Sequence, residues 1–225
     1  MFDKVVIDML LQGILESLFM VVFSTLFAYL IGLPLGIVLV VTDNEGIRPC
    51  GWLNSVLNVI VNLTRSVPFL ILAVAIIPFT RFVVGTSIGP KATVVSLVIA
   101  GAPFVARLVE GSIQEVDKGV IEAAQSMGAT SMQIILRVML SESMPSLING
   151  CAIAATTILG YSAMAGFCGG GGLGAIAVNY GYYRYQSDIM LVTVILLIII
   201  VQIIQETGMK LTRMKDKRKS VSYTH

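Results

Sequence analysis

The segment from Glu122 to Gly128 (Glu-Ala-Ala-Gln-Ser-Met-Gly) carries the most recognisable chemistry in this chain. Glu122 offers a charged contact, whereas Ala123, Ala124 and Gly128 add little side-chain bulk. Small residues let a helix approach another surface closely, and glycine accepts the left-handed conformation that often ends a helix. Because this is the chemistry of docking and not of bond making, we expect the segment to bind a partner protein.

Local signals predict a helix on each side of Gly128. Asp117 precedes a helical stretch over residues 119–127, and an acidic side chain stabilises a helix N-terminus. Thr130 and Gln133 have the Thr-x-x-Gln spacing of a capping box. We therefore expect two short helices joined at Gly128, within a polar loop over residues 114–143.

The second of these helices is predicted to begin near Ser131. Its apolar residues recur at three- and four-residue spacing and should share one face: Met132, Ile135 and Leu136. Ser143 is expected to cap the helix that follows, with Pro145 in its first turn.

The sequence lacks the motifs of an enzyme. No Gly-x-x-x-x-Gly-Lys-[Ser/Thr] phosphate loop occurs, and the glycine-rich run at 169–172 has neither the lysine nor the hydroxyl that such a loop needs. Cys50, Cys151 and Cys168 have no metal-type spacing, and the single histidine is His225. We predict a non-catalytic chain without a cofactor or metal of its own, with the glycines serving either as flexible backbone or for close helix packing.

The composition explains what positions the loop. Of 225 residues, 56% are hydrophobic and 12% charged, against about 25% charged in soluble domains. A bilayer core requires roughly 20 apolar residues per helix. We predict an all-α polytopic membrane protein with a single domain over 1–225 and five spans, at about 18–41, 67–84, 92–108, 147–165 and 189–204.

The Lys and Arg residues predict the orientation of these spans. With the N-terminus outside, the longest loop and the basic C-terminal tail at 210–219 lie in the cytosol, together with most of the 15 cationic residues. Arg65 and Arg107 then fall at cytosolic span ends, and Glu110 is placed to pair with Arg107. Three amides share one helix face before the second span: Asn54, Asn58 and Asn62. This face is expected either to lie at the membrane interface or against a neighbouring helix, or to line a substrate path.

The Glu-Ala-Ala-x-x-x-Gly motif in this loop resembles the coupling loop of bacterial ABC importer permeases. The resemblance extends through nearly the whole chain, and the stretches around Pro68, Thr86 and Tyr161 are similar to the permease subunit of methionine importers. The family has a proline where this chain has Ser141, a departure at the exit of the loop.

The resemblance implies a five-helix permease of the methionine-importer type in the bacterial inner membrane. It implies an ATPase subunit in two copies, which binds ATP and Mg²⁺ and docks on Glu122, Ala123, Ala124 and Gly128. It further implies an extracytoplasmic methionine-binding protein, a second copy of this chain and surrounding lipid, but no nucleic acid. Tyr161, Ser162 and Met164 are the candidates for the substrate pathway of L- and D-methionine, with ordinary helix packing as the alternative.

Three other functions compete with this interpretation. One is an ABC permease for another amino acid or small solute. A second is an ATP-independent carrier or channel, which typically has ionisable groups within its spans or an inverted repeat. A third is a membrane assembly factor, for which the loop motif would be a coincidence.

Overall fold

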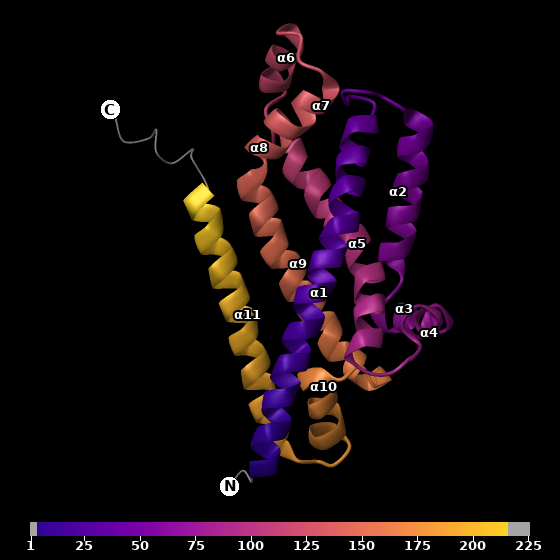
Figure 1. Ribbon diagram of the computed structural model, residues 1–225, viewed down its shortest axis with the longest axis vertical. Coiled ribbons are helices and arrows are strands. Elements are labelled where there is room, and N and C mark those ends of the chain that lie inside the picture. Colours follow the sequence, from indigo (N-terminus) through magenta and orange to yellow (C-terminus); the bar gives the residue numbers. More distant parts are fainter. Residues whose placement is uncertain (1–3, 216–225) are drawn as a thin grey trace.

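The computed structural model describes residues 4–215, and every element in that range is helical. Four helices form the long elements of the bundle: α1 (Lys4–Thr42), α5 (Pro90–Gln114), α9 (Met144–Ala165) and α11 (Ser187–Lys215). They run along the long axis of the molecule, with α6 to α8 gathered at one end and α10 at the other (Figure 1). These four are long and apolar enough to cross a membrane, so the expected fold class is confirmed.

The helix predicted over 67–84 is divided in the structure. Helix α2 (Gly51–Ser66) runs beside α1, and the chain bends by 101° between α2 and α3 (Phe69–Ala75). Helix α4 (Ile77–Val84) follows after a single non-helical residue. Pro68 and Pro78 account for these breaks, because proline lacks an N–H donor and disfavours the helical conformation of the residue before it. If the bent pair α2–α3 counts as one span, the number of spans is five.

The close approach of α1 and α5 forms the centre of the bundle. A Cβ atom on Gly32 would lie 2.7 Å from the carbonyl oxygen of Ala102, and one on Gly36 would lie 2.6 Å from that of Ala106. Only glycine permits this backbone contact, which is the small-residue packing typical of membrane helices. Buried side chains of α1, α5 and α9 fill the core around it: Met20, Leu97, Val105, Val109 and Ile158.

The glycine-rich run after α9 packs backbone against backbone. After a short 3₁₀ turn (Gly166–Cys168), α10 (Gly172–Ile176) lies against the last turn of α9, and a π-helix (Ala177–Tyr182) continues beyond the end of α9. A Cβ atom on Gly174 would lie 2.4 Å from the carbonyl oxygen of Ala163. Glu16 Oε2 accepts a hydrogen bond from the Gly172 amide at 2.7 Å, which ties the start of α10 to α1. Of the two predicted alternatives for the glycine run, close packing is therefore confirmed, whereas the short helices were not predicted.

Candidate functional site

The loop at one end of the bundle has the predicted two-helix design. Asp117 caps α6 (Lys118–Ser126), since its Oδ1 accepts a hydrogen bond from the Gly119 amide at 2.7 Å. Gly128 has a φ of 80°, the left-handed value that the sequence predicts. Thr130 and Gln133 form the capping box at the start of α7 (Ser131–Gln133). These local predictions are confirmed.

The second helix differs from its predicted amphipathic form. After α7 the chain continues as a π-helix (Ile134–Met139) and then as α8 (Leu140–Glu142). The wider turn shifts the helical phase, so Ile134 and Met139 are buried while Met132 and Leu136 are exposed. The predicted apolar face of Met132, Ile135 and Leu136 is therefore not the face that packs on the bundle; of the three, only Ile135 is partly buried.

The exit from the loop lies further along the chain than the family's proline position suggests. Ser141 lies inside α8, and the break falls at Ser143. The Ser143 hydroxyl donates to the Met139 carbonyl at 2.7 Å and makes no cap of α9, so the capping role predicted for Ser143 is wrong. The hydroxyl thus provides a hydrogen bond to a carbonyl group near the end of the preceding helix. Pro145 lies in the first turn of α9, as predicted.

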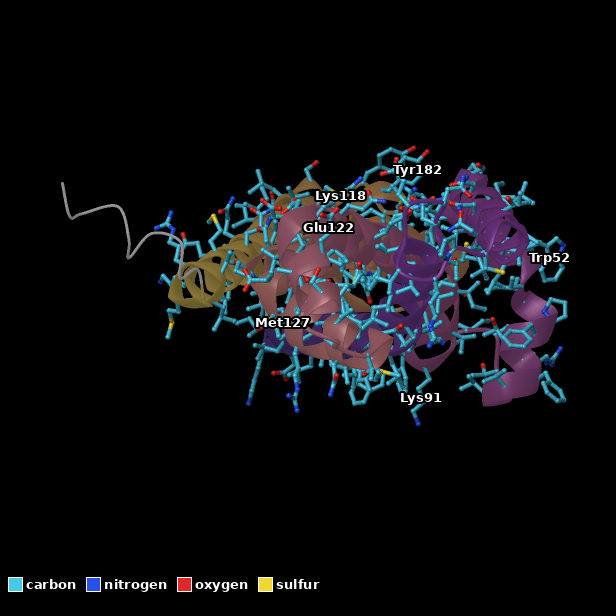
Figure 2. The ribbon with its side chains drawn as sticks, turned by 90° about the horizontal axis from the view of Figure 1, so that it is seen from above. Trp52, Lys91, Lys118, Glu122, Met127 and Tyr182 are labelled. Carbon is cyan, nitrogen blue, oxygen red and sulfur yellow. The ribbon has the colours of Figure 1, made fainter. Side chains whose placement is uncertain are left out.

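The four predicted docking residues divide between two surfaces. Ala124 is 6% exposed and belongs to the core cluster of Ile134 and Met139, so it fixes α6 to its own chain. Glu122, Ala123 and Gly128 are exposed, and a Cβ atom on Gly128 would meet nothing within 4 Å. Seen from the α6 end in Figure 2, Glu122 lies near Lys118, and Met127 lies at the opposite end of the helix. The free surface of α6 is therefore charged at one end and apolar at the other.

Two polar contacts attach this loop to the turn between α1 and α2. Lys118 Nζ forms an ion pair with Glu45, and Arg48 Nε donates to Ser131 Oγ at 3.1 Å. Lys118 lowers the pKa of Glu45, and Glu45 raises the pKa of Lys118, in each case first through their hydrogen bond. A pocket of about 440 Å³ lies between the turn and α6, with Asp43 and Glu122 in its lining.

A polar network inside the bundle joins α2 to α5. Arg107 Nη1 donates to Glu110 Oε2 at 2.6 Å, which confirms the predicted pair. Arg107 Nη2 donates to Asn58 Oδ1 at 2.6 Å and to Asn62 Oδ1 at 2.9 Å. Asn54 donates to the Leu39 carbonyl of α1 at 2.8 Å. The three amides of α2 therefore contact neighbouring helices, the first of the two alternatives.

The predicted pathway residues do not share one surface. Tyr161 stacks on Phe69 of α3, with ring centroids 4.9 Å apart and an interplanar angle of 3°. Ser162 is buried and donates to the Leu159 carbonyl at 2.8 Å within its own helix. Met164 is 48% exposed. Of the three side chains, Tyr161 is half-buried, Ser162 is buried and Met164 is exposed, and their role in a substrate pathway stays a prediction.

Arg65 lies elsewhere than predicted. The sequence analysis put it at a cytosolic span end because the second span was drawn from residue 67. In the structure α2 begins at Gly51, at the α6 end of the bundle. Arg65 lies in the last turn of this helix, about 21 Å along it from Gly51. Arg65 therefore lies within the bent α2–α3 span and not at its end, so that prediction is wrong; the side chain is exposed and lies about halfway along the bundle.

Helices of membrane-spanning length around a glycine-packed core, with a helical loop at one end, are the architecture of a polytopic α-helical membrane protein. The chain belongs to the family described as "Binding-protein-dependent transport system inner membrane component", which matches residues 32–207.

Named relatives and solved structures agree with this membership. The chain is 49% identical over 211 residues to the "Probable D-methionine transport system permease protein MetI" of Vibrio cholerae, covering 94% of each chain. It is 50% identical over 165 residues to the "Methionine import system permease protein MetP" of Bacillus subtilis, covering 73% of this chain and 74% of the relative. A structure of the MetNI methionine ABC transporter in an inward-facing conformation superposes with a TM-score of 0.95 at 43% identity, covering 96% of this chain and 100% of that chain.

Proposed function

We propose that this chain is the permease subunit of an ATP-driven importer that carries methionine, in its L and D forms, across the inner membrane. The observation that carries the proposal is the exposed surface of Glu122, Ala123 and Gly128 on α6, held rigidly to the bundle, in a chain similar to named methionine permeases. Two ATPase subunits would bind ATP and Mg²⁺ and dock on this surface in two copies of the chain. An extracytoplasmic binding protein would deliver methionine.

The charge distribution supports an orientation with the N-terminus outside and the C-terminus in the cytosol. Arg48, Lys118 and Arg137 lie at the α6 end of the bundle. Lys91, in the first turn of α5, and Arg184, in the connection before α11, lie toward the other end. Moving Arg65 to the middle of the bundle removes one cation from the cytosolic side but keeps the bias. Lys217 to Lys219 of the basic tail lie outside the described residues.

The packing of α6 explains how a force on the loop would reach the spans. Ala124 fixes α6 onto Ile134 and Met139, and these contact the core that α5 and α9 share. The Glu45–Lys118 ion pair links the same helix to the α1–α2 turn. A displacement of α6 by a closing ATPase pair would therefore move α1, α5 and α9 together, as coupling between two conformations of the bundle requires.

The test of docking is Gly128→Trp with Gly128→Asn as its matched control. Both replace a glycine at a φ of 80°, but asparagine tolerates this conformation and adds little bulk. We expect the tryptophan variant to lose co-purification with the ATPase and ATP-dependent uptake of methionine, and the asparagine variant to keep both. Retention of both properties by Gly128→Trp would show that the ATPase docks elsewhere.

A further inference from the structure

We infer that the break between α2 and α3 forms a binding site for the zwitterionic amino acid in the middle of the bundle, with Arg65 holding its carboxylate. This inference rests on the proposed function and names the place where the solute binds during passage. It concerns the pocket of about 150 Å³ whose lining includes Thr64, Arg65, Phe69, Phe104 and Tyr161.

The position of the pocket is that of a transport site. Ala100 and Phe104, which line one wall, lie on either side of the middle of α5, a 25-residue helix about 37 Å long. The opposite wall is the 101° break between α2 and α3. Transporters commonly bind substrate near the bilayer midplane at discontinuous helices, where backbone groups freed from the helix face a cavity. Both features coincide here.

The charge in the pocket requires an explanation. An arginine at the depth of the bilayer core is costly, and such residues usually pair with another group or line a pathway. Arg107 fits the first case, since it pairs with Glu110 and two amides. Arg65 is exposed, and among residues 4–215 no ion pair or side-chain hydrogen bond involves it. Its guanidinium is therefore available to bind an anionic group. A carboxylate suits it, because the planar guanidinium can donate two parallel hydrogen bonds to the two carboxylate oxygens.

The remaining walls suit the rest of a thioether amino acid. The stacked rings of Phe69 and Tyr161, with Phe104 nearby, offer an aromatic surface to which a thioether sulfur is attracted. The C-terminal end of α2 at Thr64 to Ser66 carries unpaired carbonyl groups and a partial negative charge, which favour an ammonium group. The pocket volume of about 150 Å³ equals that of about five water molecules, at roughly 30 Å³ each.

Occupancy of the pocket can be measured without transport. Thr64→Cys is introduced where Cys50, Cys151 and Cys168 are replaced by serine, and modification by a charged thiol reagent is followed in the complex with its ATPase. We expect methionine to slow the modification, and methioninamide, which lacks the carboxylate, to require a roughly 10- to 100-fold higher concentration. Arg65→Gln should abolish this preference and Arg65→Lys should keep part of it. Arg81→Gln, an exposed arginine of α4 outside the lining, should behave as the parent.

Uptake by the full complex separates failure of this site from failure of the proposed function. With binding protein and ATPase present, Arg65→Gln should lower maximal methionine uptake about tenfold or more while ATPase association stays unchanged. Equal protection by methionine and methioninamide, no protection by either, or unchanged uptake in Arg65→Gln each overturns the site. Absence of methionine uptake by the unmodified complex overturns the proposed function instead.

Discussion

Replacing Arg107 with methionine should detach α2 from the bundle. Val61 is the only fully buried residue of α2, so its polar contacts carry much of its attachment. Arg107 donates three hydrogen bonds at 2.6 to 2.9 Å, and its side chain and that of Glu110 are 22% and 15% exposed. Methionine fills a similar length without a donor, so the substitution removes the bonds while retaining most of the packing.

The size of the effect follows from these contacts. Two of these bonds, to Asn58 and Asn62, join α5 to α2. Hydrogen bonds between membrane helices contribute roughly 0.6 kcal/mol on average and up to about 1.7 kcal/mol each, so the two contribute about 1 to 3 kcal/mol. Leaving the Glu110 carboxylate without its partner adds about 1 kcal/mol. We therefore expect Arg107→Met to lower the free energy of unfolding by about 3 kcal/mol.

The assay is reversible unfolding in mixed micelles of increasing SDS content. Arg213→Met, an exposed position near the end of α11, is the control and should change the free energy by less than about 0.5 kcal/mol. Adding Glu110→Gln to Arg107→Met should recover about 1 kcal/mol, because the orphaned group is then neutral. The reasoning is refuted if Arg107→Met matches the Arg213→Met control, or if the double variant is no more stable than the single one.

Two further predictions concern the packing of the bundle and the attachment of the loop. Gly36→Val places side-chain atoms against the Ala106 carbonyl oxygen and should lower the free energy of unfolding by about 1–3 kcal/mol, whereas Gly111→Ala, at an exposed position with open space around it, should be neutral or slightly stabilising in the same assay. The pKa of Glu45 is lowered from its ordinary 4.5, so the ion pair stabilises the attachment of α6 fully above about pH 4.5, and this stabilisation is lost as the pH falls through the lowered pKa. The pKa of Lys118 is raised above its ordinary 10.5, so the stabilisation is also lost as the pH rises through that raised pKa. The rate of amide hydrogen exchange in α6, corrected for the intrinsic rate, should therefore be constant between about pH 6 and 9. The Glu45→Gln variant should exchange faster over this whole range. A change of the corrected rate with pH inside this range would argue against the ion pair.

The sequence was sufficient wherever the signal was local. Asp117, Gly128 and the Thr130–Gln133 box each act within a few residues, and each has the predicted geometry. The Arg107–Glu110 pair is equally local, being one helical turn apart. The long helices followed from hydropathy, because length and apolar composition decide whether a helix can span a bilayer.

Predictions failed in two situations. In one, tertiary packing decides which of two neighbouring residues is buried; in the other, a continuous apolar stretch of sequence contains a break between helices. Ala123 and Ala124 are indistinguishable by type, yet only Ala124 is buried, because the π-helix brings Ile134 against it. Ser162 is buried while Met164 is exposed, a distinction that needs the position of α9 in the bundle. Pro68 and Pro78 did signal the broken span, but the apolar run around them suggested one continuous helix.

The wrong start of the second span also affected the interpretation of Arg65. Drawing the second span from residue 67 put Arg65 at a membrane surface, where a cation needs no explanation. Starting the span at Gly51 moves Arg65 to the middle of the bundle, beside Phe69 and Tyr161. Pro68 is the physical signal of the break between α2 and α3, because a proline disfavours the helical conformation of the residue before it.

Methionine uptake into proteoliposomes tests the central claim most directly. The permease is reconstituted with its ATPase, the binding protein is added outside, ATP is enclosed, and labelled L- and D-methionine are offered against a panel of other amino acids. The account predicts accumulation of methionine that requires ATP, the binding protein and an unobstructed Gly128. Accumulation without ATP, or preferential uptake of a different solute, would contradict it.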